Sequence, residues 1–271
     1  MIFGGFSDHI DPLGAHIVLC DRLAELPFLR HGFSTRLGGV SSDVFASLNL
    51  SFGRGDENEA VFENFRRFAA AAGLSRNAYA FTHQIHENFV RRVGEEDVFA
   101  PSPDYTAPRS DGVFTDAAGV PLLGKSADCV PILLCCTAPR IIAFAHAGWR
   151  GTAAAIAAEA VKAMVGAGAD PKNIIAAVGP SISPCCFLTH SDVTDAMAAL
   201  PEEALKNAVT PSADGRFAVD LKAINGGILD LCGVGEVYVS EECTCCAGEK
   251  YFSHRRNGAA RGSMAAVIQL V

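Results

Sequence analysis

The sequence predicts a single α+β domain in which mixed β-sheets are flanked by helices. Short runs rich in Val, Ile and Phe recur along the chain, and amphipathic segments with helical spacing lie among them. The two kinds of segment do not alternate regularly, and this favours mixed sheets over a doubly wound parallel sheet. At 271 residues the chain exceeds the usual domain size, yet one large domain over 1–271 accommodates it.

The expected strands are short apolar runs bounded by Gly, Pro or Asp, the residues that punctuate extended segments. They cover 16–20, 28–34, 89–93, 112–115, 130–135, 141–145, 174–178, 237–240 and 265–270.

The clearest helical pattern is DENEAVFENFRRFAAAAG, which begins at Asp56. Asp56 is a suitable N-cap, Glu59 would complete a capping box three residues later, and Gly73 is a natural stop. Further helices are expected to open at Thr152, Ser191 and Asp220.

Charge and hydropathy exclude two classes of partner. The net charge is −8 and no basic run occurs, whereas a protein that binds nucleic acid needs a basic face. The most apolar region, 120–149, is interrupted by Lys125, Asp128 and Arg140, so we expect no membrane span. The N-terminal stretch MIFGGFSDHIDPLG lacks the basic start and apolar segment of a signal peptide. We therefore expect a cytoplasmic protein.

The ten cysteines do not resemble a disulfide framework. Three pairs are adjacent in sequence, which is awkward for loop-closing bridges, and a reducing compartment would keep them as thiols. We expect most to be small buried hydrophobic residues. Cys129 is the exception, and Cys185, Cys243 and Cys245 are less clear than the rest.

Three residues lie where chemistry is expected, at the ends of predicted strands. His86 in THQIHENFV precedes a strand, Cys129 in SADCVP opens one, and His146 in AFAHAGWRG ends one. Two imidazoles and a thiolate form a three-ligand zinc set with a fourth position for water or substrate. Zinc would lower the pKa of bound water to about 7. Asp128 is placed for proton transfer or for supporting a ligand.

Spacing alone leaves two alternatives open. The separations of 43 residues between His86 and Cys129, and of 17 between Cys129 and His146, match no compact zinc motif. A metal-free pair, with Cys129 as nucleophile and His146 as base, fits the pattern equally well.

A series of motifs then decides the family resemblance. HGFSTRLGGVSS, SLNL, QIH, DGVFTD, SADCVPILL, AFAHAGWRGT, AAVGPSISPCCF, ECT and YFSHRRNG occur in that order, from about residue 31 to the C-terminus. Together they resemble the YfiH/laccase-domain (DUF152) family, whose members have been called multicopper polyphenol oxidoreductases and, later, purine nucleoside phosphorylases.

The resemblance implies that His86, Cys129 and His146 are zinc ligands. It implies phosphorolysis of adenosine, inosine and methylthioadenosine, with adenosine deamination at the same site, so the partners would be a small nucleoside and phosphate. Copper is the less suitable metal, because a laccase needs about four coppers and this chain has few spare histidines. The implied fold is α/β/β/α, related to the catalytic domain of a cytotoxic necrotizing factor. That relative uses a Cys/His pair, which keeps a cysteine hydrolase or amidase as an alternative; a peptidoglycan-editing accessory factor is another.

The chain departs from the family pattern at several positions. Glu87 stands where the family usually has Gly, and His83 is an additional imidazole that we expect to be a surface or supporting residue. The terminal family motif T-G-R-M-A becomes AARGSMA at 259–265, which leaves an anion-binding role for Arg261 open.

Candidate substrate-binding residues complete the prediction. Arg36, beside two glycines, is suited to phosphate, and Arg150 and Arg255 are similar candidates. Asn49 would hydrogen-bond a ribose or base, or would cap a turn. Asp111 is expected only to end a loop. The sequence does not indicate an oligomeric state.

Overall fold

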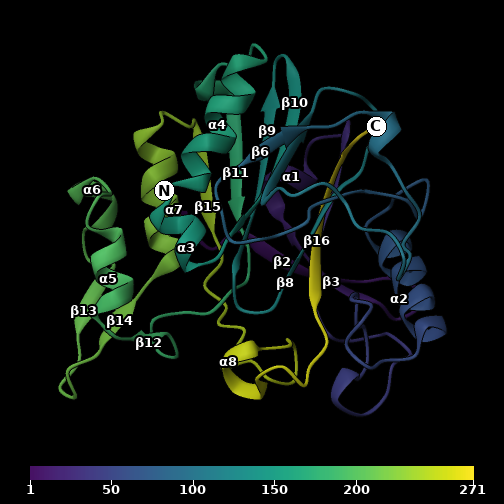
Figure 1. Ribbon diagram of the computed structural model, residues 1–271. Coiled ribbons are helices and arrows are strands. Elements are labelled where there is room, and N and C mark those ends of the chain that lie inside the picture. The colour runs from purple at the N-terminus through teal and green to yellow at the C-terminus, as the bar shows by residue number, and fades with distance from the viewer.

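The computed structural model covers residues 1–271 and stacks its elements in four layers, in the order helix, sheet, sheet, helix (Figure 1). This confirms the predicted α+β class with mixed sheets flanked by helices.

The first sheet has seven strands in the order β1-β15-β11-β9-β10-β7-β6. Its centre is an antiparallel hairpin of β9 and β10, whereas β15 runs parallel to both β1 and β11, and β6 runs parallel to β7. The bounds are β1 Ile2–Phe3, β15 Glu236–Val239, β11 Ile174–Val178, β9 Val130–Thr137, β10 Arg140–Ala147, β7 Gly112–Thr115 and β6 Val90–Arg92.

The second sheet has six strands in the order β2-β3-β4-β16-β8-β5, all antiparallel except the pair β5 and β8. The bounds are β2 Phe6–Ile10, β3 His16–Cys20, β4 Leu29–Ser34, β16 Met264–Leu270, β8 Leu122–Ser126 and β5 Ala80–Phe81. A small third sheet joins β12 Leu188–Thr189, β14 Phe217–Val219 and β13 Val209–Pro211.

The helices cover the two outer faces of the paired sheets. α3, α4 and α7 lie beside the seven-stranded sheet, and α2 lies on the far side of the second sheet (Figure 1). None of the helices has the length and apolar character that a membrane crossing requires. The bounds are α1 Asp21–Ala24, α2 Asn58–Ala71, α3 Trp149–Ala153, α4 Ile156–Gly166, α5 Ser191–Met197, α6 Glu202–Leu205, α7 Leu221–Leu231 and α8 His254–Asn257.

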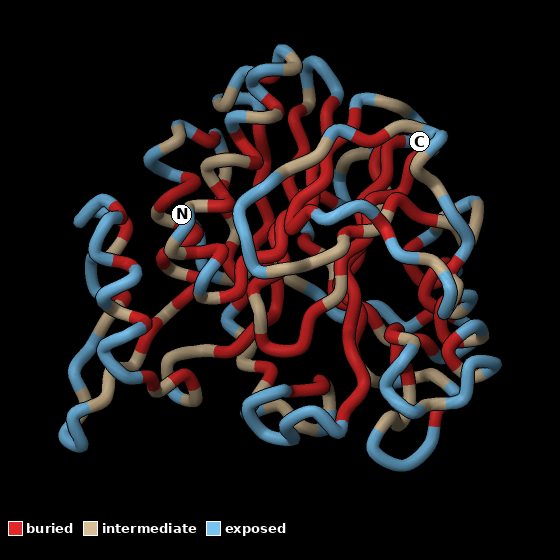
Figure 2. The backbone as a smooth tube through the Cα atoms, in the orientation of Figure 1, coloured by how far each residue is buried: buried red, intermediate tan, exposed pale blue.

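Three apolar cores separate the four layers, and the side-chain alternation of each strand assigns residues to them. In β9, Ile132 and Leu134 pack toward the helices, whereas Leu133 and Cys135 pack between the sheets. Strand β16 likewise contributes to the core between the sheets and to the core under α2. The buried strands form the continuous centre of the molecule in Figure 2.

Two helix predictions need correction. The capping box at Asp56 does not form, because the Asp56 carboxylate instead accepts hydrogen bonds from Ser41 and Asn49, and α2 begins two residues later. The helix expected from Thr152 is two helices, α3 and α4, broken at Ala155 with φ +55°. The cap at Asp220 is confirmed: its carboxylate accepts from the Ala223 N–H at 3.0 Å.

Candidate metal centre and its cavity

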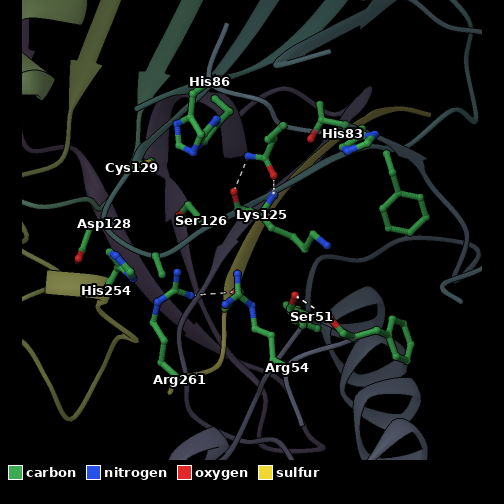
Figure 3. Close-up of a pocket in the computed structure, with 18 of the residues that line it drawn as sticks. Ser51, Arg54, His83, His86, Lys125, Ser126, Asp128, Cys129, His254 and Arg261 are labelled. Carbon is green, nitrogen blue, oxygen red and sulfur yellow. Dashed lines mark hydrogen bonds between the residues drawn. The ribbon is translucent and has the colours of Figure 1, made fainter. Parts of the chain in front are cut away.

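The three predicted metal ligands converge in the structure. The ligand atoms of His86, Cys129 and His146 all lie within 4.8 Å of one another, and the two imidazole centroids are 5.0 Å apart. Figure 3 shows His86 and Cys129 at one end of a cavity. Two imidazoles and one thiol are a donor set that holds a single ion and leaves a coordination position open.

Strand pairing explains why residues so distant in sequence meet. Cys129 lies immediately before β9, and His146 lies near the end of β10, where it pairs with Pro131. The antiparallel hairpin therefore places both residues at the same edge of the sheet. His86 reaches this edge from the loop between β5 and β6.

Asp111 fixes the loop that carries His86 and orients His146. Its carboxylate accepts backbone N–H bonds from Ile85, His86 and Glu87, each at 3.0 Å. It also bonds His146 Nδ1 at 2.9 Å, which leaves Nε2 of that ring for a metal. Asp111 is fully buried, so it has a larger role than ending a loop.

The backbone around the ligands is tightly constrained. His86 and Asp128 have φ values of +63° and +87°, a region that non-glycine residues rarely occupy and that clusters at functional sites. A Cβ atom on Gly148 would lie 2.7 Å from His86 Nδ1 and 3.2 Å from Cys129 Sγ. Only glycine fits there without displacing a ligand.

Asp128 makes contacts that the sequence did not indicate. Its carboxylate accepts hydrogen bonds from Thr244 Oγ1 at 2.7 Å, Ser253 Oγ at 2.9 Å and the Arg255 N–H at 2.6 Å. Through these bonds Asp128 connects the C-terminal loops to the segment that carries Cys129. It hydrogen-bonds none of the three candidate ligands, whereas Asp111 bonds His146, so Asp111 is the better placed of the two to support a metal there. Asp128 does line the cavity, and its proton-transfer role stays a prediction.

The protonation of the imidazoles follows from their neighbours. Burial opposes the charge on His146, but the Cys129 thiolate and the Asp111 carboxylate outweigh burial and raise the pKa of His146 to about 9. Burial and the charge of His146 lower the pKa of His86. Without a metal, therefore, the protonated form is favoured at His146 and disfavoured at His86.

The site opens into a cavity of about 720 Å³, within the usual range for small-molecule sites. Arg54, Lys125 and Arg261 line it away from the metal ligands (Figure 3). None of the three forms a salt bridge, and Arg261 Nε is buried without a partner. Burial and the nearby Arg54 lower the pKa of both Lys125 and Arg261, the latter to about 10.

The structure places only some of the predicted substrate-binding residues in the cavity. Arg150 and Arg255 line the cavity. Arg36 does not: its guanidinium donates to the Ala46 and Gly248 carbonyls and lies over the Phe252 ring. Asn49 does not line it either, because its fully buried amide holds the loop before Arg54 through Ser51 and Ser263.

The cavity also has an apolar part. Aromatic rings line it beside the cationic residues, and His83 lies at this side with Nδ1 3.1 Å from the Ala107 carbonyl, away from the ligand triad. The rings belong to Phe52, Phe65, Phe81, Tyr105, Trp149 and Phe187.

The chain matches the family described as "Multi-copper polyphenol oxidoreductase laccase" over residues 30–271. It belongs to this family. A relative from Geobacillus stearothermophilus named purine nucleoside phosphorylase YlmD is 36% identical over 244 residues, covering 88% of each chain. A purine nucleoside phosphorylase from Deinococcus radiodurans is 37% identical over 254 residues, covering 90% of this chain and 93% of its own length.

Solved structures agree with this assignment. The crystal structure of the Bacillus licheniformis hypothetical protein YfiH superposes with a TM-score of 0.87 at 30% identity, covering 94% of this chain and 96% of the other. That of YlmD from Geobacillus stearothermophilus superposes with a TM-score of 0.85 at 32% identity, covering 97% and 99%. The family resemblance and the predicted fold are confirmed.

Sequence reasoning missed Asp111, Arg54 and Lys125 as parts of the site. Asp111 and Lys125 carried a usable signal, because each is a charged residue beside or inside an apolar strand. Arg54 lies in an irregular loop, SFGRGDE, where the sequence carried no such signal.

Proposed function

We propose that the protein is a zinc-dependent purine nucleoside phosphorylase that acts on adenosine, inosine and methylthioadenosine and also deaminates adenosine. One observation carries the proposal: the His86, Cys129 and His146 donor set shares its cavity with three cations that have no counter-ion.

The three cations are the proposed phosphate site. Arg54, Lys125 and Arg261 face the cavity without a salt-bridge partner, and Arg261 is buried with its Nε unpaired, so their positive charge is not compensated by a carboxylate in the free protein. Arginine presents a planar set of donors that matches phosphate oxygens, and lysine adds a point charge. Binding of a phosphate dianion would compensate these charges.

The metal would be held by His86, Cys129 and His146, with Asp111 fixing the tautomer of His146. A bound zinc ion supplies Lewis acidity at its open coordination position. The protein's own contribution is orientation: Asp111 immobilises the His86 loop through three backbone bonds, and the hairpin sets the position of Cys129 relative to His146.

The proposed phosphorolysis is a displacement at the ribose. A phosphate oxygen held by the cations attacks C1′ of the ribose, the bond between C1′ and the purine nitrogen breaks, and its electron pair leaves with the base. The proton carried by the phosphate ends on the released purine, which balances the reaction. The aromatic rings of the cavity offer faces for the purine, and Arg150 lies over the Trp149 ring with 4.0 Å between its guanidinium carbon and the ring centroid.

A second candidate has its own support. The contact between Cys129 and His146, with the raised pKa of His146, is the pairing that a cysteine hydrolase or amidase uses. In that case phosphate would not be consumed, and turnover would proceed in metal-free protein.

Product analysis tests the proposal. Purified protein is incubated with inosine or adenosine, with and without inorganic phosphate, and the products are identified by mass spectrometry. We expect free base and pentose 1-phosphate only when phosphate is present, and inosine from adenosine without it. Release of free ribose at the same rate with and without phosphate would contradict phosphorolysis.

A matched pair of variants tests the phosphate site. Arg54→Gln should raise KM for phosphate by about 10- to 100-fold, the effect of losing one charge-assisted contact, and should leave phosphate-independent deamination unchanged. Arg92→Gln is the control, because Arg92 is exposed and pairs with Asp116 outside the cavity. Equal phosphate dependence in both variants would remove Arg54 from the proposed site.

A further inference from the structure

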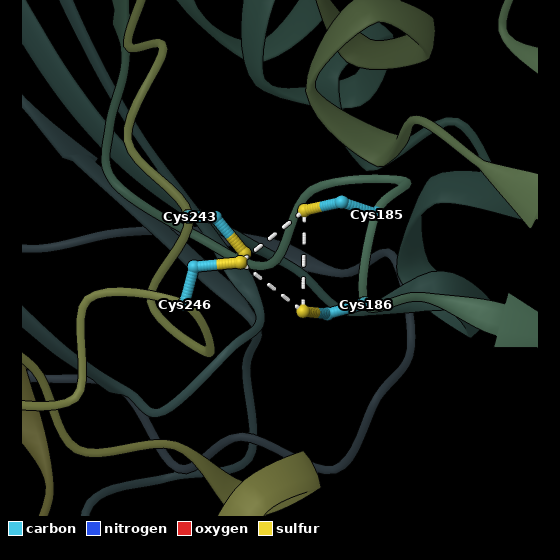
Figure 4. A group of neighbouring side chains, drawn as sticks. All are labelled: Cys185, Cys186, Cys243 and Cys246. Carbon is cyan, nitrogen blue, oxygen red and sulfur yellow. Dashed lines mark hydrogen bonds between the residues drawn. The ribbon is translucent and has the colours of Figure 1, made fainter.

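Four cysteines outside the cavity converge on one point. Cys185 and Cys186 lie in the turn after β11, and Cys243 and Cys246 lie in the turn after β15. Figure 4 shows their side chains gathered from the two loops. The four sulfur atoms all lie within 4.8 Å of one another, although the two pairs are about sixty residues apart in sequence.

The sulfur separations distinguish a metal site from a disulfide. Cys246 Sγ lies 3.5 Å from Cys185 Sγ and 3.3 Å from Cys186 Sγ, and the two adjacent cysteines are 3.9 Å apart. A disulfide would require about 2.05 Å. Zinc with four bonds of about 2.3 Å in a tetrahedron separates its sulfur ligands by about 3.8 Å. The observed spacing matches four ligands around one ion.

The backbone holds the two loops together independently of the thiols. The Thr244 N–H donates to the Ser181 carbonyl at 3.1 Å, and the Ser183 N–H donates to Cys243 Sγ at 3.4 Å. An N–H that points at a cysteine sulfur stabilises the thiolate form and orients the ligand. The loops are therefore preorganised with their sulfurs facing inward.

The charges around the cluster fit an anionic centre. Lys222 is only 3% exposed and forms no salt bridge, and its Nζ donates to the Glu242 carbonyl at 2.8 Å. Burial lowers the pKa of Lys222, and negative charge on Asp220, and then on Cys243 and Cys185, acts in the opposite direction. Arg255 and Arg256 donate to the carbonyls of Cys186 and Cys245, at 2.7 and 2.6 Å. Burying an ammonium group that forms no salt bridge is costly, and charged sulfurs nearby would offset that cost.

We propose that Cys185, Cys186, Cys243 and Cys246 bind a zinc ion in a second, structural site. On binding, four thiols release four protons to solvent and form four Zn–S bonds, giving a centre with a net charge of −2 that Lys222, Arg255 and Arg256 compensate. All four coordination positions are occupied by protein, so the ion has no place for substrate.

The second site would stabilise the walls of the first. Thr244 and Arg255 both donate to the Asp128 carboxylate, and Asp128 precedes Cys129. An ion that clamps 183–187 to 243–247 therefore holds in place the loops that position the catalytic cavity. This role does not depend on which reaction the cavity performs.

Metal stoichiometry tests the proposal. Reduced, demetallated protein is reloaded with Zn²⁺, passed through a desalting column, and its zinc and protein contents are measured. We expect about two zinc ions per chain in the wild type and about one in Cys243→Ser/Cys246→Ser. Cys232→Ser, which changes a half-buried cysteine outside both clusters, is the control and should retain both ions.

A cavity variant keeps the test independent of whether the double serine variant folds. His86→Ala/His146→Ala retains the four cysteines, and when loaded with Co²⁺ it should show the sulfur-to-cobalt charge-transfer bands of a tetrathiolate. X-ray absorption of its zinc form should show four sulfur ligands at about 2.3 Å. Failure of this variant to bind zinc or cobalt would overturn the proposal. A wild type that contains disulfides among these cysteines after reloading under reducing conditions would overturn it too.

Discussion

Replacing Asp111 with Asn tests how the metal centre is built. The Asp111 carboxylate accepts bonds from the N–H groups of Ile85, His86 and Glu87 and from His146 Nδ1, and it is fully buried. Asn has one oxygen and one NH₂ in place of two oxygens. If the oxygen faces His86 and His146, the NH₂ faces the N–H groups of Ile85 and Glu87, and two partly buried donors lose their acceptor.

The expected magnitudes follow from this arrangement. An unsatisfied buried donor costs about 1–3 kcal/mol, and because these two donors are only partly buried, Asp111→Asn should lower the free energy of unfolding by about 2 kcal/mol, the low end for two donors. In the alternative orientation the NH₂ group faces the His86 N–H and His146 Nδ1. His146 Nδ1 then has no acceptor, and the ring is no longer held in one tautomer. Loss of such a supporting carboxylate typically lowers metal affinity by about 10- to 100-fold.

Two measurements check the prediction: urea unfolding at pH 7.5, and zinc affinity by competition with a chromophoric chelator. Asp116→Asn is the matched control, because Asp116 is near in sequence, exposed and paired only with Arg92. An Asp111→Asn protein with the wild-type unfolding midpoint and wild-type zinc affinity at the cavity site would refute the reasoning.

Three further outcomes follow from the same structure. Gly148→Ala should lower zinc occupancy of the cavity site, measured by elemental analysis, because its Cβ would meet His86 Nδ1 at 2.7 Å; Gly166→Ala, where a Cβ meets open space, should not. Burial lowers the pKa of His31 to about 4 from an ordinary value of 6.5, so its neutral form stabilises the fold fully above pH 6.5. The free energy of unfolding should therefore fall by about 3 kcal/mol as the pH falls from 6.5 to 4. Urea unfolding at a series of pH values should show this loss in the wild type and a smaller loss in His31→Gln. Cys243→Ser/Cys246→Ser should raise KM for the nucleoside at a cavity still loaded with zinc, measured by initial rates, because the loops that hold Asp128 loosen.

Sequence patterns predicted the central strands well, because a buried strand appears in the sequence as an apolar run bounded by residues that interrupt strands. The runs at 16–20, 112–115 and 174–178 coincide with β3, β7 and β11. Strand β2 was missed because FSDHI is mostly exposed and polar at the edge of its sheet. The break between α3 and α4 was missed because Ala155 adopts a left-handed conformation that its side chain does not reveal.

Some residues of the candidate site were predicted from the sequence and others were not, and the difference has a physical reason. The proposed metal ligands His86, Cys129 and His146 are unusual residue types for the ends of apolar strands, so they can be recognised in the sequence. Residues that act through other residues, such as Asp111, depend on which loop lies beside them, and only the fold determines that. The cysteine cluster was missed for the same reason: Cys246, expected to be buried, is exposed, and it meets the exposed Cys185 only because β11 and β15 are neighbours.

The central claim is that turnover depends on a metal ion at His86, Cys129 and His146. The most direct test is to remove all metal with a strong chelator, restore zinc in steps, and record purine release from inosine and phosphate at each zinc occupancy. Intact-mass spectrometry of the quenched enzyme is run in parallel. We predict no activity in the metal-free protein, recovery in proportion to occupancy of the cavity site, and no substrate adduct. Full activity in metal-free protein, or an adduct mapped to Cys129, would contradict the account and identify the thiol as the nucleophile.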